Sequence, residues 1–363
     1  MEFIESFFNG APVWLTAILF FAGLVLIIKG GDWFVDSASW IAEVLGVPKF
    51  VIGATIVSIA TTLPEMIVSI AATVKGNVDM AAGNAIGSVT ANTAMIMGIF
   101  LVLCGKPPEM KRKDFAPKSL MMFGASATLV LGSIFTEKRL LTFENETQNY
   151  YSLSLTGTVV LIIIFVVFFI ENYFSMKNNS VQIEPRPDGI GLQEEDDIVP
   201  TKDTVTKGEW VKNIAMFILG AAGTVIGAEL LVNAGTVLAE DIGISQRVIS
   251  VLAVAIGTSL PELVTTITAL RKKEGALSVG NILGANIIDL SLILPICSFI
   301  STGKGNGSLA VSASSVTIDM MVCLGAIAVA IFPTIISKKF HRWQGCVMLV
   351  GYIGYVASTF LVK

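Results

Sequence analysis

The chain has 363 residues, of which 53% are hydrophobic and only 14% are charged, and its formal net charge is −4. Its mean hydropathy is +0.76, and a soluble domain carries roughly 25% charged residues. The composition therefore excludes an ordinary soluble protein, gives no reason to expect a nucleic-acid partner, and indicates a membrane protein with many spans.

Ten apolar stretches are long enough to cross a membrane, because a hydrocarbon core of ~30 Å needs roughly 20 helical residues. The first stretch is longer than one upright helix requires, so we expect it to tilt or to bend at Gly30-Gly31. Within it, Lys29 is expected to snorkel or to pair with Asp32. The predicted spans are 12–42, 48–74, 78–104, 118–136, 152–174, 211–238, 245–270, 276–301, 309–333 and 343–361.

Basic residues collect in the connections that follow odd-numbered spans, such as Lys111 to Lys113 and Arg271 to Lys273. The positive-inside rule then predicts that the N-terminus faces outside. Glu2 and Glu5 precede the first span, so there is no basic segment typical of a cleavable signal peptide. We expect a monomeric integral protein of the cytoplasmic (inner) membrane of a prokaryote.

Three parts are predicted along the chain. Residues 1–174 form a first repeat of five spans, 175–209 a linker, and 210–363 a second repeat of five spans. The linker holds the acidic run Glu194 to Asp197 and three prolines, which predicts a disordered cytoplasmic segment. The run lacks the ligand spacing and glycine of an EF-hand, so a solvated linker is favoured over a regulatory Ca²⁺ site. Because five is odd, the second repeat must insert upside down, as in many secondary transporters.

An internal duplication lies at the centre of both halves. Ala60-Thr61-Thr62-Leu63-Pro64-Glu65 matches Gly257-Thr258-Ser259-Leu260-Pro261-Glu262, 197 residues further on. The segments 83–92 and 280–289 match at the same offset, so the alignment extends without a gap.

The duplicated motif places oxygen atoms inside an apolar span. A carboxylate in hydrocarbon is costly, so Glu65 and Glu262 are candidate functional residues. Each proline lacks an amide hydrogen, which leaves the carbonyls of Ala60 and Gly257 without their helical partner. Carboxylate, hydroxyl and carbonyl oxygens suit hard cations such as Ca²⁺ and Na⁺.

Four polar stripes are expected to meet at a pseudo-twofold axis, with glycines at 83, 87, 280 and 284 allowing close helix contact. They contain three carboxylates and no basic residue, so the cluster needs a cation or protons. The alternative is structural: hydroxyls bonded to their own helix, Asn84 and Asn281 joining helices, and one protonated glutamate. Asp319 has no evident partner. The stripes are Ser58, Thr62, Glu65 and Ser69; Ala255, Ser259, Glu262 and Thr266; Asn84, Ser88 and Asn92; and Asn281, Ala285 and Asp289.

The two repeats, G-x-S/T-x-P-E followed by G-N-x-x-G-(S/A)-x-x-x-(N/D), resemble the α-repeats of the Ca²⁺:cation antiporter (CaCA) superfamily, the Na⁺/Ca²⁺ exchangers. The resemblance implies an all-α membrane fold of ten transmembrane helices in two inverted five-helix repeats. It also implies exchange of Na⁺ for Ca²⁺ by alternating access, without a cofactor. By position, Glu65 and Glu262 would be the central Ca²⁺ ligands. The Ca²⁺ and Na⁺ sites would be completed by Thr61, Thr62, Thr258, Ser259, Ser88, Asn92 and Asp289, with backbone carbonyls near Ser58 and Ala255.

Three departures from the family pattern leave ion coupling open. Ala60 replaces the usual first glycine, Val89 stands where many prokaryotic members have asparagine, and Ala285 replaces a serine. A K⁺-dependent Na⁺/Ca²⁺ exchanger is therefore an alternative. A Ca²⁺/H⁺ antiporter is another, although that branch typically has an acid where Gly87 or Gly284 stands.

A channel and a membrane enzyme are the two competing classes of function. A channel would share the acidic midplane but would pass one ion without exchange. An enzyme is disfavoured, because His341 is the only histidine and no hydrolase or HExxH motif is present. The expected partners are therefore Ca²⁺ and Na⁺, with K⁺ or H⁺ as alternatives, and membrane lipid.

Overall fold

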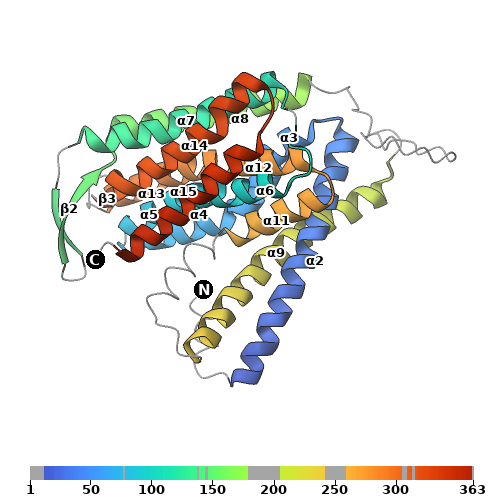
Figure 1. The fold of residues 1–363 in the computed structure, drawn as a ribbon, viewed down its shortest axis with the longest axis horizontal. Helices are drawn as coiled ribbons and strands as arrows, with labels where there is room; N and C mark the ends of the chain where they lie inside the picture. The colour runs from blue at the N-terminus through green and yellow to red at the C-terminus, as the bar shows by residue number, and fades with distance from the viewer. Residues whose placement is uncertain are drawn as a thin grey trace.

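A computed structural model describes residues 12–76, 78–108, 110–136, 139–143, 146–178, 205–241, 259–304, 309–312 and 315–361. Nearly all of these residues are helical, and segments named η are π-helices (Figure 1). The first half contains α2 (Val13–Leu45), α3 (Lys49–Ile52), η1 (Gly53–Val57), α4 (Ser58–Val74), α5 (Val78–Thr90), η2 (Ala91–Ile96), α6 (Met97–Leu103), α7 (Arg112–Ile134) and α8 (Leu155–Asn178). The second contains α9 (Lys207–Asp241), α11 (Leu260–Arg271), α12 (Gly275–Ile288), η3 (Asp289–Ile293), α13 (Leu294–Gly303), η4 (Ser315–Asp319), α14 (Met320–Ser337) and α15 (Arg342–Leu361).

Within the described residues, eight helical segments are long and apolar enough to cross a membrane. Of the other two predicted spans, 343–361 coincides with α15. The span 245–270 ends in α11, and its residues 245–258 lie outside the described residues. The count of ten therefore stays a prediction. The eight segments are Val13–Leu45, Lys49–Val74, Met80–Leu103, Arg112–Ile134, Leu155–Lys177, Lys207–Leu238, Gly275–Gly303 and Ser315–Ser337.

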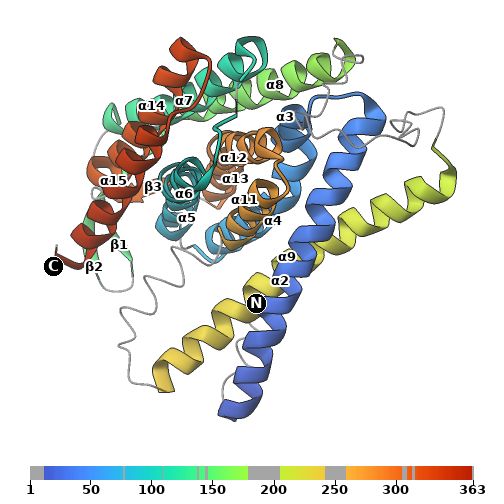
Figure 2. The same cartoon turned by 45° about the vertical axis from the view of Figure 1, so that its right-hand side comes forward.

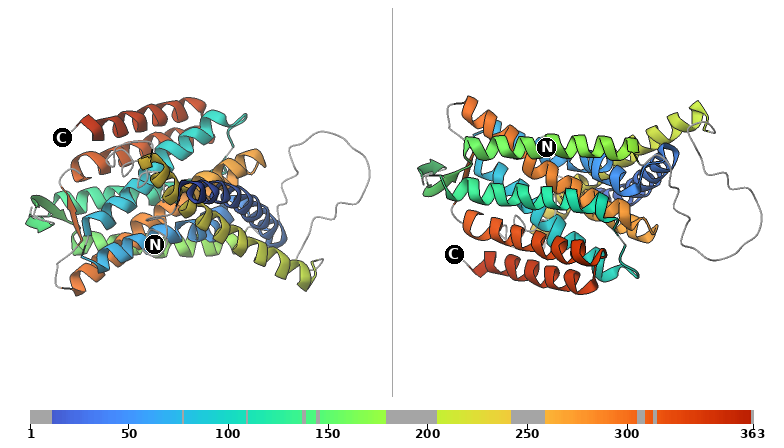
Figure 3. Two further views of the ribbon diagram at one scale, coloured as in Figure 1. Left: turned by 90° about the horizontal axis from the view of Figure 1, so that it is seen from below. Right: turned by 90° about the horizontal axis from the view of Figure 1, so that it is seen from above.

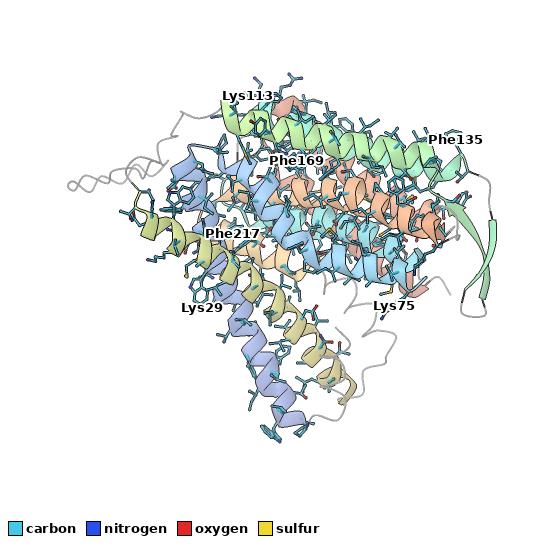
Figure 4. All side chains as sticks on the ribbon, turned by 180° about the vertical axis from the view of Figure 1, so that it is seen from behind. Lys29, Lys75, Lys113, Phe135, Phe169 and Phe217 are labelled. Atoms are coloured by element: carbon cyan, nitrogen blue, oxygen red, sulfur yellow. The ribbon has the colours of Figure 1, made fainter. Side chains whose placement is uncertain are left out.

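The helices form three groups. On one side, α8, α7, α14 and α15 lie in a row in that order (Figure 3). The middle group contains α4, α5, α11, α12 and α13, which pack on one another. On the other side, α2 and α9 cross and extend away from the bundle (Figure 2). Seen from behind, Lys113 and Phe135 mark opposite ends of the row that contains α7 (Figure 4).

Glycines bring α2 and α9 into close contact. A Cβ atom added at Gly30 would lie 2.9 Å from the carbonyl oxygen of Gly220, and one at Gly23 would lie 3.0 Å from that of Gly227. Gly23 and Gly30 are the equivalents of Gly220 and Gly227 at the offset of 197. The two contacts are thus reciprocal, as a twofold axis requires. The helix α2 continues through Gly30-Gly31, so these glycines serve packing and do not interrupt the helix.

A second contact indicates that the pseudo-twofold axis passes between α7 and α14. The hydroxyl of Ser126 on α7 lies 4.0 Å from the Sγ atom of Cys323 on α14, and these residues are 197 positions apart. Equivalent residues can touch only on or near the axis that relates them. The described contacts therefore support a pseudo-twofold relation between the two halves.

A three-stranded antiparallel sheet lies at one end of the bundle (Figure 1). It consists of β1 (Arg139–Phe143), β2 (Glu146–Ser152) and β3 (Ala310–Ser312), with Leu141 opposite Gln148 and Tyr151 opposite Val311. The purely helical fold class was therefore wrong in this detail, because residues 310–312 pair with β2 instead of starting span nine. Cross-strand pairing over such a distance leaves no local periodic signal.

Three charged residues have partners that the sequence did not predict. Lys118, expected at the edge of a span, is fully buried within α7 and forms an ion pair with Glu171 of α8. Asp319 accepts a hydrogen bond of 3.0 Å from the Tyr355 hydroxyl. Lys29 is exposed on the α2–α9 pair (Figure 4), and the carboxylate of Asp32 lies 3.7 Å from Lys272 of α11.

Candidate functional site

Two π-helices occupy equivalent places in the two halves. The segment η2 begins at Ala91, next to Asn92, and η3 begins at Asp289, which is the equivalent of Asn92. After η3, Pro295 has no amide hydrogen to donate to the carbonyl of Ser291, which favours a locally widened helix. Wide π turns inside α-helices are frequent at functional sites.

The two proline motifs adopt different local structures. Pro64 lies inside α4, which continues from Ser58 to Val74, and the carbonyl of Ala60 has no amide partner at that proline. Pro261 lies in the first turn of α11, where a missing amide hydrogen costs little, and Ser259 precedes the helix. The predicted free carbonyl of Gly257 lies outside the described residues.

Three carboxyl groups are buried in the middle group of helices. Glu65, Glu262 and Asp289 have no exposed surface, and none of their six carboxylate oxygens has a hydrogen-bond partner among the described residues. The three groups are close enough for their charges to repel one another. An unpaired charge in the interior costs several kcal/mol, so the cluster must hold protons or bind a cation.

The ion pairs of the structure do not neutralise this cluster. In the described part of the chain, the lysines that pair with acids contact carboxylates elsewhere, namely Glu43, Glu274, Glu171, Asp32 and Asp36. In the described ranges, no group of three His, Cys, Asp or Glu side chains is arranged so that it could hold a metal ion by itself. A cation here would need hydroxyl, amide and backbone oxygens in addition to the carboxylates.

Such oxygens lie around Glu262. The hydroxyl of Thr61 lies beside the Glu262 carboxylate but donates its hydrogen bond to Asn281 Oδ1, at 3.2 Å. Thr62 donates to the carbonyl of Ser58 at 2.7 Å, and Ser58 itself donates to its own helix. Thr62 and Ser58 therefore bond their own helix, as the structural alternative expects, but a hydroxyl that donates its hydrogen still presents lone pairs to a cation.

A second group of oxygens lies around Asp289. Ser88 lies beside the Asp289 carboxylate, and its hydroxyl is 3.5 Å from that of Ser259 on α11. Asn92 donates to the Ser88 hydroxyl at 3.4 Å and leaves its own Oδ1 without a partner in the described structure. The structure thus brings these predicted residues together from both halves. Ala255 and Thr258, also predicted, lie outside the described residues.

The two asparagines of the G-N-x-x-G segments do join helices. Asn84 donates to the Ser69 hydroxyl at 3.0 Å and to the Glu65 carbonyl at 3.4 Å, both within the first half. Asn281 accepts from Thr61 across the two halves. Their roles in the described structure are therefore helix contacts next to the acids.

Close helix contact is confirmed for the glycines of the second half. A Cβ atom at Gly284 would lie 2.5 Å from the Ser58 hydroxyl and 2.6 Å from the Ala54 carbonyl, and one at Gly280 would overlap the Phe50 carbonyl. For Gly83 and Gly87, no described atom lies within 4 Å of such a Cβ. The contact holds α12, which leads into Asp289, against η1 and α4.

One buried amide near the cluster was not singled out from the sequence. Asn286, on the last turn of α12, donates to Thr93 Oγ1 at 2.8 Å and lies beside Met122. The only available signal was the offset alignment, in which Asn286 faces Val89.

Comparisons with known proteins agree over almost the whole chain. The family model described as sodium/calcium exchanger protein matches residues 15–174 and 212–361. The sodium/calcium exchanger MaX1 of Methanosarcina acetivorans is 31% identical, over 95% of this chain and 98% of its own. The putative antiporter CaxA of Alkalimonas amylolytica is 29% identical, over 94% and 97%. The solved sodium-calcium exchanger NCX_Mj, soaked with 10 mM Na⁺ and zero Ca²⁺, superimposes with a TM-score of 0.73 at 27% identity, over 96% and 99%.

Proposed function

Because the chain belongs to the sodium/calcium exchanger family, we propose that it is a secondary antiporter that exchanges Na⁺ for Ca²⁺ by alternating access. Members of this family are transporters and not enzymes, and the ions are their transported substrates. The proposed ion site lies between the two halves, at the buried carboxylates.

The observation that carries this proposal is the set of six unpaired carboxylate oxygens on Glu65, Glu262 and Asp289. Ca²⁺ takes 6–8 oxygen ligands in flexible geometry, and the surrounding side chains offer only oxygens. We propose Glu65 and Glu262 as the central Ca²⁺ ligands. The neighbouring donors of the Ca²⁺ and Na⁺ sites would be Asp289, Asn92, Ser88, Ser259, Thr61, Thr62 and Thr258, with the carbonyls near Ser58 and Ala255.

Mutual repulsion of the acids gives a reason for exchange. Without a cation, the cluster combines burial with like-charge repulsion, and both oppose closing the site to water. A bound Ca²⁺ or a set of Na⁺ ions removes that cost. Since both ions would need the same carboxylates, they compete, and the site changes the side from which it is accessible only when it is loaded with one or the other.

Proton coupling is the second candidate. The cation/proton branch typically has a further acid at the position of Gly87 or Gly284, and both are glycine here. At Gly284, Ala54 and Ser58 lie within 2.6 Å of a Cβ placed there, whereas no described atom lies within 4 Å of one at Gly87. The two glycines favour Na⁺ coupling over proton coupling, whereas K⁺ dependence has no comparable observation for or against it.

We further propose the topology that the charge distribution predicts. The N-terminus would face outside, the linker 175–209 would lie in the cytoplasm of a prokaryote, and the protein would act as a monomer. The test for topology is given with the predictions below.

Flux in reconstituted vesicles tests the function. We expect ⁴⁵Ca²⁺ uptake when an opposed Na⁺ gradient is imposed, and none with a K⁺ gradient or a pH gradient alone. Uptake driven by a pH gradient in Na⁺-free medium would instead establish the Ca²⁺/H⁺ antiporter. Ca²⁺ current without any opposed gradient would identify a channel and overturn the proposal.

A further inference from the structure

A single buried hydrogen bond links the two π-helical regions of the site. Asn286 Nδ2 donates to Thr93 Oγ1 at 2.8 Å, and both side chains are fully buried. Thr93 follows Asn92 in η2, and Asn286 lies one helical turn before Asp289, at the start of η3. The bond therefore spans the two halves immediately beside an amide and an acid that occupy equivalent positions.

The pseudo-twofold axis does not reproduce this bond. The equivalents of Asn286 and Thr93 are Val89 and Leu290, which are both buried and apolar. α5, which carries Val89, packs on η3, which carries Leu290. One side of the axis thus has a directed polar contact, and the other side has apolar side chains.

The oxygen atoms of Asn92 and Asp289 are weakly fixed in the described structure, where Asn92 is held by its 3.4 Å bond to the Ser88 hydroxyl. Asn92 Oδ1 and both Asp289 oxygens lack hydrogen-bond partners there. Asn286 likewise leaves its Oδ1 without a partner among the described residues, but its Nδ2 has two contacts, the bond to Thr93 and a distance of 3.4 Å to Met122 Sδ on α7. Loss of a group that orients the ligands of a metal ion typically costs about 10–100-fold in affinity.

The charges of the three carboxylates indicate which ion's binding this arrangement should affect. Two of the three carboxylates, Glu65 and Glu262, are balanced by one divalent cation. Asp289 is then left for a monovalent cation or a proton, and its equivalent in the first half is the neutral Asn92. The separation of Asn92 and Asp289 should therefore matter more for Na⁺ than for Ca²⁺.

We propose that Asn286 is a positioning residue that, through Thr93, fixes Asn92 relative to Asp289 and so sets the apparent affinity of the site for Na⁺. The inference rests on the proposed function for the identity of the ions. A merely structural contact would behave differently, since its loss would change thermal stability, to which such contacts contribute little, and would not change the response to Na⁺. Loss of the bond should leave stability almost unchanged but alter the Na⁺ response.

The experiment compares Asn286→Val, Thr93→Val and their double variant with two references. Thr93→Ser keeps the acceptor, and Val89→Ala perturbs packing at the equivalent position in the first half. We measure the Na⁺ concentration for half-maximal Na⁺-driven Ca²⁺ flux in vesicles. In parallel, we measure the Na⁺ concentration that half-maximally raises the thermal unfolding temperature of the purified protein.

Both single variants should raise the two Na⁺ midpoints about tenfold, as for other groups that orient ion ligands. The double variant should be no worse than the worse single variant, because both remove one bond. The Ca²⁺ midpoint should move by less than about twofold, and Thr93→Ser and Val89→Ala should keep the Na⁺ midpoint within about twofold. Unchanged Na⁺ midpoints, equal shifts for Na⁺ and Ca²⁺, or the same shift in Val89→Ala would overturn the proposal.

The two readouts separate this proposal from the function on which it rests. If the parent exchanges ions but the variants do not shift, only the positioning role fails. Suppose instead that the parent does not exchange Na⁺ for Ca²⁺, but Na⁺ raises its unfolding temperature and the variants shift that Na⁺ midpoint as stated. The transport function then fails and the positioning role stands. A parent with neither exchange nor Na⁺-dependent stabilisation overturns both.

Discussion

The crossing of α2 with α9 and the buried acid cluster use the same pseudo-twofold relation in opposite ways. At the crossing, Gly23 meets Gly227 and Gly30 meets Gly220, so both halves supply the same residue type. At the cluster, the equivalent of Asp289 is Asn92. Close packing of helices needs only the absence of a side chain, which a duplication supplies twice. Binding ions of unequal charge needs donors of unequal charge, so symmetry is lost there.

The largest effect should come from the pair of acids that remains symmetric. Glu65→Gln or Glu262→Gln keeps the shape of the side chain but removes a charge, and we expect Ca²⁺ flux to fall to background while the protein still folds and inserts. Glu43→Gln makes the same chemical change in a partly exposed ion pair with Lys49 and is the control. Near-parental transport by either cluster variant would place the central site elsewhere.

The next effect tests the symmetric crossing. Gly30→Ala and Gly227→Ala each place a Cβ atom 2.6 Å from a backbone nitrogen of the opposite helix. Overpacking of this kind costs about 1–3 kcal/mol, and equivalent positions should lose similar thermal stability in detergent. Gly351→Ala, where no atom of the described residues lies within 4 Å of the added Cβ, is the matched control. Clearly unequal losses at Gly30 and Gly227 would contradict a symmetric crossing.

A smaller effect is expected where the symmetry is already broken. Asp289→Asn makes the position identical to Asn92, so we expect Ca²⁺ transport to weaken about tenfold, which corresponds to ~1.4 kcal/mol, or its dependence on Na⁺ or K⁺ to change. ⁴⁵Ca²⁺ flux at varied Na⁺ and K⁺ measures both. A loss as complete as that of Glu65→Gln would make Asp289 a third central ligand.

The smallest effect should come from the linker, which has no counterpart in the repeats. Cys346 is the exposed cysteine of the described chain, so the test uses a Cys346→Ser background. A cysteine introduced at Glu194 should react with an impermeant reagent only from the cytoplasmic side, and partial deletion of 175–209 should leave transport intact. Labelling from outside intact cells would reverse the topology.

Much of the fold follows from hydropathy alone. The predicted span 276–301 is found at Gly275–Gly303, and 12–42 at Val13–Leu45. The acids were also predictable, since a carboxylate inside an apolar span is costly wherever the chain folds. The hydropathy of the spans and the acids within them are signals that are local or repeat at a fixed offset, so a single sequence was enough to predict them.

Pairings between distant residues could not be predicted in this way. The partner of Lys118 lies 53 residues away, and that of Asn286 lies 193 residues away. Neither pair belongs to a periodic pattern, and neither is duplicated. β3 pairs with a strand more than a hundred residues earlier, so its three residues were assigned to the adjacent apolar span.

The Lys118–Glu171 pair has a consequence for how the chain enters the membrane during synthesis. The segment that contains Lys118, α7, has a hydropathy of 1.2, the lowest among the eight candidate spans, whereas α8 reaches 2.4. A lysine within a span raises the free energy of insertion by roughly 2.5–3.5 kcal/mol at the helix centre. Its partner is not available until α8 has been translated. We therefore expect α7 to insert stably only together with α8. A nascent chain truncated after α7 should insert poorly, and Lys118→Leu should restore its insertion. Efficient insertion of the truncated parent would contradict this.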